Sequence, residues 1–408
     1  MTVTPPDQQP GSVRSKAQSR LQQLGEALHR QWGLGERILL SWAPVADGLK
    51  VLWAPHYFLG NFTASMNDGR PEDRMEALNG SFLRKLISGR RQMSDEDIEG
   101  TARRFSLTVD RVYLAKGDVL SATDFDAVES LVRRYSISYV ESRAALLFDI
   151  ADFSIFTPFE QTSQINSLSY SLNSAYNKMK SRNIEIDFAR TTTGDGFYIW
   201  NRDTGPMANV NLFRFMVMVV ADNAIAKRKA RGNTVPVIRT GFHIGSHYEF
   251  YQSEGMSPTL SSYIVGDLTI ELARMVDSAA PGQILLGDFH TRIPTSASDD
   301  AYMVEVDTER LVDRVRKSFR NLEGLELAGE AIQQLWCFLS GETGAIGGES
   351  IRRFVVTDKH GRTREVYNLM IHIQSAHRDS MLLGSPVPPG PVAAVDRSAS
   401  PLSRRWRG

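Results

Sequence analysis

Apolar and polar residues recur with two different periods along this chain, and each period predicts a different kind of element. From Leu21 to Trp32 the apolar residues return every three to four positions, which predicts an amphipathic helix over residues 17–33. Two β-prone runs follow, Arg37 to Trp42 and Leu49 to Trp53, and the turn residues 46–48 between them predict a hairpin.

The middle of the chain alternates between helical and strand-like patterns. Apolar residues after Pro158 keep helical spacing as far as Met179, and the apolar run Phe215–Ala221 predicts a packed helix that continues to Lys229. The alternation predicts an α+β, ferredoxin-like sandwich with a mainly antiparallel sheet, preceded by an N-terminal α/β extension. Strands are expected at residues 184–188, 196–200, 237–244 and 283–286.

The pattern is simpler on either side of this core. Residues 60–105 are polar and mostly helical by pattern, and so is the stretch 308–322. Two β-prone runs, residues 352–357 and 365–373, flank a turn at 358–361 and predict a C-terminal hairpin.

Composition along the chain predicts four parts. Residues 1–16 and 375–408 are polar and rich in proline and serine, so we expect both to be disordered. Residues 17–138 form an N-terminal region to which the sequence assigns no role. Residues 139–374 form the main domain, which the C-terminal hairpin completes.

Two aspartates carry the most distinctive chemistry. Asp149 follows the apolar run 146–148, and Asp195 lies between two glycines before the β-prone run 197–200. Carboxylates at strand ends suit hard divalent cations that also bridge substrate phosphates. The interval between them has room for a helix of about 20 residues and a return strand, a βαβ-type unit. The alternative is that Asp149 only ends a strand and Asp195 only forms a turn.

The composition of the whole chain argues against several other classes of protein. The 408 residues include 42% hydrophobic and 23% charged residues, which allows a sizeable core. Lys plus Arg and Asp plus Glu both total 47, so net charge gives no reason to expect nucleic acid or an acidic membrane as a partner. The single cysteine, Cys337, excludes a disulfide framework. The first residues lack the apolar core of a signal peptide, and we expect a cytoplasmic protein.

Four blocks in order resemble the catalytic domain of class III nucleotidyl cyclases. Phe148–Ser154 resembles that family's Phe-x-Asp-Ile-x-Gly-Phe-Thr, and Gly194-Asp195 resembles its Gly-Asp hairpin. Arg239–Gly245 resembles its Arg-x-Gly-x-His-x-Gly strand. Val265–Met275 followed by Pro281–Leu285 resembles its arginine-bearing helix and Pro-Gly-x-Ile strand.

The resemblance implies cyclisation of a nucleoside triphosphate, in which the ribose 3′-hydroxyl attacks the α-phosphorus and pyrophosphate leaves. Two divalent ions per site, Mn²⁺ or Mg²⁺, would be held by Asp149, Asp195 and the backbone of Ile150. The resemblance also implies a homodimer, because in this family each site takes its metal aspartates from one domain and its arginine from another.

The same resemblance assigns the phosphate contacts. Phe153 and Ser154 fall where backbone amides at a helix start would hold the triphosphate. Arg274 matches the arginine that steadies charge on the transferring phosphate, and the alternative is a helix-surface salt bridge. Lys359 is the nearest candidate for the family's triphosphate lysine, although a solvated turn is the alternative.

The positions that read the base depart from the purine cyclases. Thr191 stands where those enzymes have lysine or glutamate, and Tyr263 stands where they have aspartate or cysteine. A bulky Tyr263 in a base pocket favours a smaller base. The alternative is a tyrosine packed against the core.

Two further positions depart from the family pattern. Ile270 replaces the asparagine that orients the ribose, which places activity or positioning in question. Asp152 replaces a glycine, and we expect it to cap the helix that follows.

These departures resemble the pyrimidine cyclases of bacterial Pycsar antiphage systems. The resemblance implies UTP, less readily CTP, as the substrate, and a cyclic nucleotide product that acts on a separate effector protein. An adenylate or guanylate cyclase with an atypical base pocket and a non-catalytic nucleotide-binding sensor are the alternatives. Residues 17–138 would then regulate the cyclase, detect a phage component or extend the dimer surface.

Overall fold

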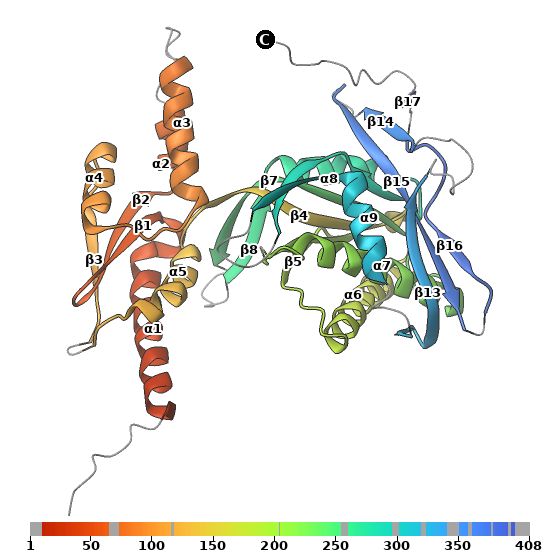
Figure 1. Ribbon diagram of the computed structural model, residues 1–408, viewed down its shortest axis with the longest axis horizontal. Coiled ribbons are helices and arrows are strands. Elements are labelled where there is room, and N and C mark those ends of the chain that lie inside the picture. The colour runs from red at the N-terminus through yellow and green to blue at the C-terminus, as the bar shows by residue number, and fades with distance from the viewer. Residues whose placement is uncertain are drawn as a thin grey trace, which may run out of the picture. The chain divides into compact units, whose positions relative to one another are not determined.

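The computed structural model describes residues 10–64, 73–115, 118–203, 205–253, 260–295, 302–319, 324–340, 351–357, 361–376, 378–390 and 393–395 (Figure 1). The chain divides into two compact units, Met1–Glu141 with His247–Val265, and Ser142–Ser246 with Gly266–Gly408. The expected main domain, residues 139–374, therefore differs from the second unit, because residues 247–265 group with the first.

The first unit is built on an antiparallel sheet in the order β1-β2-β3. The expected hairpin is confirmed, since Val45 of β1 pairs with Gly48 of β2. A Cβ on Gly48 would lie 2.0 Å from the carbonyl oxygen of Val112, so only glycine fits there. The strands are β1 (Arg37–Val45), β2 (Gly48–Pro55) and β3 (Val109–Tyr113).

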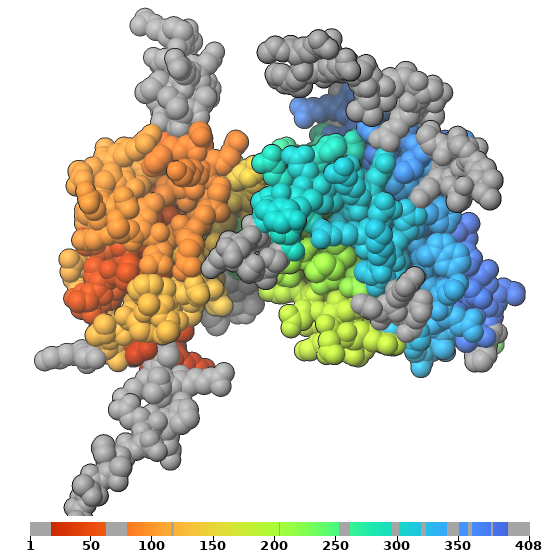
Figure 2. Space-filling view, in the orientation of Figure 1, coloured from red at the N-terminus to blue at the C-terminus, as the bar shows by residue number. Residues whose placement is uncertain are grey.

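Helices cover both faces of this sheet. On one face Leu39 and Val51 pack with Leu24 and Val128, and on the other Leu40 packs among side chains of two more helices. In the space-filling view the red-to-yellow atoms of this unit form one mass (Figure 2). The helices are α1 (Pro10–Trp32), η1 (Gly33–Gly35), α2 (Phe58–Ala64), α3 (Asp73–Ser88), α4 (Asp95–Phe105), η2 (Ala122–Asp124) and α5 (Phe125–Arg133).

Helix α1 begins earlier than the sequence predicts. Residues 10–16, which we expected to be disordered, belong to the helix. The reason is that Pro10 suits a first helical turn and no later proline interrupts the run. Residues 1–9 lie outside the described residues.

The second unit is built on a larger sheet, whose described strands follow the order β12-β13-β15-β9-β7-β4-β6-β5. Strands β7 and β9 pair in parallel, whereas β4–β6, β5–β6, β9–β15 and β13–β15 pair antiparallel. The expected α+β class is confirmed, whereas the expected antiparallel pairing holds only in part, because β7 and β9 run parallel. These strands are β4 (Ser138–Ile150), β5 (Phe188–Thr192), β6 (Gly196–Asn201), β7 (Ile238–Ser253), β9 (Ile284–Gly287), β12 (Glu326–Leu327), β13 (Glu330–Leu339) and β15 (Thr363–Ser375).

The expected βαβ-type unit is present in a split form. Strands β4 and β5 both pair antiparallel with β6, which lies between them, so β4 and β5 run parallel. Helix α6 (Pro158–Ser181) connects them, as the helical spacing after Pro158 predicts. Asp149 therefore lies near the end of β4, and Asp195 lies in the turn that leads into the neighbouring antiparallel strand β6.

Helices pack on both faces of this sheet (Figure 1). Phe148 and Phe242 point into a core shared with Leu168 of α6 and Phe213 of α7 (Ala208–Lys229). On the other face Gly241 leaves room for α8 (Asp267–Asp277), since a Cβ there would lie 2.9 Å from Val276. Helix α9 (Thr308–Ser318) joins the first of these cores through Leu311, Val312 and Val315.

The C-terminal hairpin forms as expected between β14 (Arg353–Thr357) and β15. The expected disordered tail, 375–408, is wrong in part. Strand β16 (Met381–Leu383) pairs with β15, and β17 (Ala393–Val395) pairs with β14. Composition misses these short strands because their order comes from pairing with strands already in place. The remaining short elements are η3 (Phe153–Ile155), β8 (Leu260–Val265), β10 (His290–Pro294) and β11 (Met303–Asp307).

None of the described helices combines the length and the apolar character that crossing a bilayer requires.

Candidate active site

Asp149 and Asp195 come together at one end of the strand pair β4–β6. Asp149 is the penultimate residue of β4 and lies opposite Gly196, the first residue of β6. The backbone N–H of Ile150 donates to the carbonyl oxygen of Asp195 at 2.9 Å. The structure thus joins the three residues that the sequence assigns to the metals.

Two glycines shape the turn that carries Asp195. Gly194 has φ 102°, in the left-handed region that favours glycine. A Cβ on Gly196 would lie 1.9 Å from the carbonyl oxygen of Phe148, so a side chain there would separate β6 from β4. Thr193 donates from its hydroxyl to Oδ1 of Asp195 at 3.0 Å. Backbone geometry therefore requires the two glycines on either side of Asp195.

Asp149 lies in a charged but half-buried environment. Burial raises the pKa of its carboxyl above the ordinary value, Arg239 of β7 opposes this shift, and the nearby carboxylates of Asp195 and Asp277 add to it. Arg239 donates from Nε to Oδ2 of Asp149 at 2.8 Å, and Nη2 donates to the same oxygen. Within the described residues no hydrogen bond reaches Oδ1, so this oxygen is available to a cation.

Tyr198 and Asp277 extend the site toward α8. The Tyr198 hydroxyl donates to the carbonyl oxygen of Thr269 in α8 at 3.1 Å. Burial, and then the charges of Asp277 and Asp149, raise the pKa of Tyr198 to about 12. Asp277, at the end of α8, is therefore close enough to act electrostatically on both the tyrosine and Asp149.

Arg274 lies in the last turn of α8, one turn after Ile270 and three residues before Asp277. This spacing places the three side chains on one face of the helix. Leu272 and Val276 are buried against the sheet, whereas Ile270 is 43% exposed and Asp277 is exposed. The arginine thus lies on the face of α8 that is not packed into the core.

Phe153 and Ser154 begin the short helix η3, directly after the Asp149 motif. The first N–H groups of a helix have no partner within it, so these amides can bind an anion. The expected capping role of Asp152 is wrong. Asp152 has φ 57° and makes no side-chain cap, and the helix that follows, α6, is capped instead by Thr157 with Glu160. A left-handed Asp152 serves the turn between β4 and η3.

The two positions assigned to base reading lie in different units. Thr191 of β5 pairs with Tyr198, so it lies on the sheet face that carries Tyr198 and Asp149. Tyr263 of β8 belongs to the first unit, where its ring stacks on Phe250 with centroids 5.9 Å apart. That contact matches the alternative of a packed tyrosine. Lys359, assigned to the triphosphate, lies outside the described residues.

The donor set of this site fits a hard divalent cation. It offers the two carboxylates and the backbone carbonyl of Ile150, which are the oxygen ligands that Mg²⁺ and Mn²⁺ prefer. The described residues contain no group of three or more His, Cys, Asp or Glu side chains that could hold a metal alone. Such ions often keep only one or two protein carboxylates and take their other ligands from water and substrate phosphates.

Three members of the site were missed in the sequence as functional residues. The sequence indicates Arg239 only as part of a strand motif and assigns no role to Tyr198 or Asp277. The available signals were a basic residue at the start of a predicted strand and an acid three positions after Arg274. Neither signal shows which residue Arg239 or Asp277 acts on, because that depends on how β4, β6 and β7 are aligned in the sheet.

No protein-family model matches the chain, and no curated protein matches it. Solved structures with some similarity include several nucleotide cyclases. They include the guanylate cyclase domain of RhGC from Catenaria anguillulae in complex with GTP (12% identity, 58% of this chain and 98% of that chain, TM-score 0.33). The adenylyl cyclase CyaB from P. aeruginosa is 12% identical, over 60% of this chain and 98% of that chain, with a TM-score of 0.32. The guanylyl cyclase Cya2 is 10% identical, over 57% of this chain and 92% of that chain, also with a TM-score of 0.32. At these low scores the likeness adds no weight, and the function is inferred from the residues.

Proposed function

We propose that this protein is a nucleotidyl cyclase of the class III type that converts a pyrimidine nucleoside triphosphate into its 3′,5′-cyclic nucleotide and pyrophosphate. The observation that carries the proposal is the meeting of Asp149 and Asp195 across β4 and β6, tied by the Ile150–Asp195 backbone bond. Of the four sequence blocks, only the two that contain Asp149 and Asp195 bring their carboxylates close together.

The residues divide the work by their chemistry. Asp149, Asp195 and the Ile150 carbonyl would hold two divalent ions, which when bound supply positive charge to the attacking and leaving oxygens. Arg239 orients the Asp149 carboxylate through Oδ2. The Phe153 and Ser154 amides would receive phosphate oxygens, and Arg274 would stabilise charge on the transferring phosphate.

The choice of a pyrimidine rests on Thr191, because Tyr263 packs against Phe250 in the other unit. Thr191 is half-buried on the sheet face that carries Asp149, and a threonine there offers one hydroxyl where purine cyclases have a charged side chain. UTP is the preferred candidate and CTP the second. A purine substrate would require other polar groups to pair with the base.

We further propose that two copies share each site. Large apolar side chains next to the Asp149 motif are exposed, Ile155 by 77% and Phe159 by 78%. Exposed apolar groups beside a phosphate site are typical of an interface. Mixing an Asp149→Ala chain with an Arg274→Ala chain should restore one working site per dimer, and no recovery would contradict shared sites.

The resemblance to the Pycsar cyclases extends the proposal to antiphage signalling in the cytoplasm. The cyclic nucleotide would then bind a separate effector protein. A neighbouring gene that encodes an effector with a cyclic-nucleotide-binding module would support this role.

The decisive experiment incubates the purified protein separately with ATP, GTP, CTP and UTP plus Mn²⁺, and identifies products by mass spectrometry. A cyclic pyrimidine nucleotide that disappears in Asp195→Ala would support the proposal. A cyclic purine would keep the cyclase and overturn the base assignment. No product from any of the four would favour a nucleotide-binding sensor, for which the exposed Ile270 is the specific observation.

A further inference from the structure

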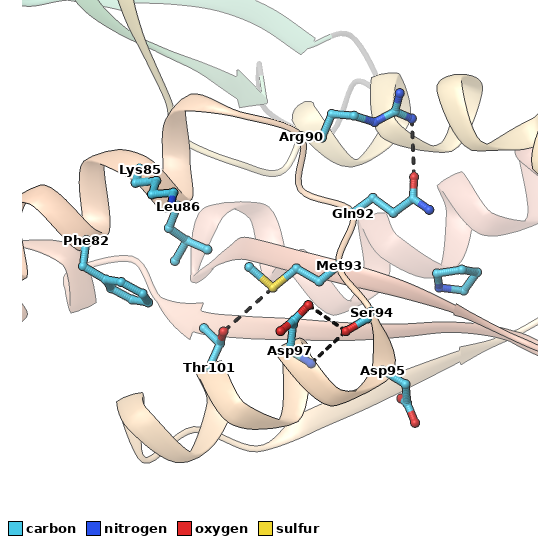
Figure 3. A pocket seen from close by; sticks show the side chains of 11 residues that line it. Phe82, Lys85, Leu86, Arg90, Gln92, Met93, Ser94, Asp95, Asp97 and Thr101 are labelled. Carbon is cyan, nitrogen blue, oxygen red and sulfur yellow. Dashed lines mark hydrogen bonds between the residues drawn. The ribbon is translucent and has the colours of Figure 1, made fainter.

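The first unit contains a cleft of about 820 Å³ that has no part in the proposed catalysis (Figure 3). It lies between α3, the loop 89–94 and the start of α4, and Pro44 of β1 also lines it. Its volume is that of sites that take small organic molecules.

The floor of the cleft is apolar and held in place. Phe82, Leu86 and Met93 line it. The guanidinium of Arg104 lies 3.7 Å from the centroid of the Phe82 ring, and the Phe105 ring contacts the same ring at 5.7 Å. A floor fixed in this way can bind an apolar or aromatic body without a large ordering cost.

The acids at the rim are already compensated within the protein. Lys50 forms an ion pair with Asp95 at 2.5 Å, and Ser94 donates its hydroxyl to Asp97 at 2.7 Å. Both acids also lie in the first turn of α4, where the helix dipole stabilises negative charge. Asp95 and Asp97 therefore do not require a cationic ligand in the cleft.

The cations at the rim are available. Lys85 is exposed at the end of α3, with no ion pair to another described residue. Arg90 pairs with Asp126 at 2.9 Å, but the two side chains are 52% and 89% exposed. Such a surface pair is weak and can exchange its carboxylate for a ligand anion. The cleft thus combines an apolar floor with two cations.

Hydrogen bonds of Arg91 connect the wall of the cleft to the start of β4. Arg90 and Gln92 line the cleft, and Arg91 between them is 1% exposed. The Arg91 guanidinium donates to the carbonyl oxygens of Leu86 at 2.7 Å and Ile137 at 2.9 Å, and to Oγ of Ser138 at 3.1 Å. One buried group therefore links the cleft wall to the first residue of the strand whose penultimate residue is Asp149.

We propose that this cleft binds a small amphipathic organic anion, with an aromatic or alkyl body and a carboxylate, sulfonate or phosphate, and that Arg91 transmits its occupancy to the start of β4. The anion pairs with Lys85 and Arg90, and the body covers Phe82 and Met93. The binding step does not depend on the proposed cyclase activity.

The first test is a fluorescence titration of the full chain with 8-anilinonaphthalene-1-sulfonate, an aromatic anion. We expect saturable binding that Lys85→Glu weakens by roughly tenfold or more, since it replaces a charge-assisted contact with repulsion. The matched control is Lys317→Glu, another exposed lysine in the last turn of a helix, which should bind as the unchanged protein does. Equal loss in both variants, or loss in neither, overturns the site.

The second test measures backbone hydrogen exchange with and without the dye. Exchange in residues 137–141 should slow on binding in the unchanged chain and stay constant in Lys85→Glu. Binding that depends on Lys85 without any change in residues 137–141 overturns the Arg91 route. Both readouts are independent of cyclase products, so failure here is distinct from failure of the proposed function.

Discussion

Arg239 donates two hydrogen bonds to a single carboxylate oxygen of Asp149, from Nε at 2.8 Å and from Nη2. This arrangement engages Oδ2 and leaves Oδ1 without a hydrogen bond from the described residues. A ligand carboxylate held in one orientation binds a cation without first losing rotational freedom, and outer partners of this kind commonly affect metal affinity.

Replacing Arg239 should therefore weaken metal binding. We expect Arg239→Gln to lower Mn²⁺ affinity by about 10-fold, measured by isothermal titration calorimetry or by electron paramagnetic resonance of free Mn²⁺. Arg292→Gln is the control, because the Arg292–Glu305 pair is exposed on both sides. Unchanged affinity in Arg239→Gln would contradict a positioning role.

The turn at Asp195 depends on Gly196. A Cβ added at position 196 would lie 1.9 Å from the Phe148 carbonyl oxygen. Gly196→Ala should therefore displace the start of β6 and lower the free energy of unfolding by about 1–3 kcal/mol. Metal binding should fall with it, because Asp195 moves with the turn. Gly89→Ala meets nothing within 4 Å and should change neither quantity. Denaturant unfolding with Mn²⁺ titration distinguishes the two variants.

Gly287 and His243 form a second close contact, beneath α8. A Cβ on Gly287 would lie 2.2 Å from Nδ1 of His243, and the ring cannot swing freely because it contacts Phe289. We expect Gly287→Ala to lower the free energy of unfolding by about 1–3 kcal/mol. If the clash is the cause, His243→Ala should recover part of this loss in the double variant, and purely additive losses would exclude it.

His243 also predicts a pH dependence. Burial lowers the pKa of His243 to about 4, below the ordinary 6.5. Between these values the unfolded chain binds a proton that the folded chain does not, so stability from this group is full above pH 6.5 and falls as the pH drops toward 4. Across this pH window the free energy of unfolding should change less steeply with pH in His243→Gln. The control His290→Gln, at an exposed position, should keep the slope of the unchanged protein.

Much of the fold follows from local patterns in the sequence. The β1–β2 hairpin, helix α6 and the C-terminal hairpin are where periodicity and turn residues place them, because each depends on neighbours close in the chain. The helix between the two aspartate motifs also follows from the sequence, whereas the antiparallel pairing of β4 with β6 does not.

The rest depends on contacts between distant segments. The role of Arg239 requires that β7 lie beside β4, and the order of β16 and β17 requires β14 and β15 to be in place. Asp152 illustrates a different limit. Its residue type suits a helix cap, but the three-residue turn η3 intervenes and Thr157 takes that position.

The first unit is assembled from two stretches of chain, Met1–Glu141 and His247–Val265, and the second stretch contributes the outer half of β7 and all of β8. The polypeptide therefore crosses from one unit to the other three times. No single cut yields either unit intact, so a fragment that starts at Ser142 still carries residues 247–265, which group with the unit that has been removed. A simple fusion at one chain boundary would therefore not replace the first unit, because residues 247–265 of that unit lie beyond the boundary.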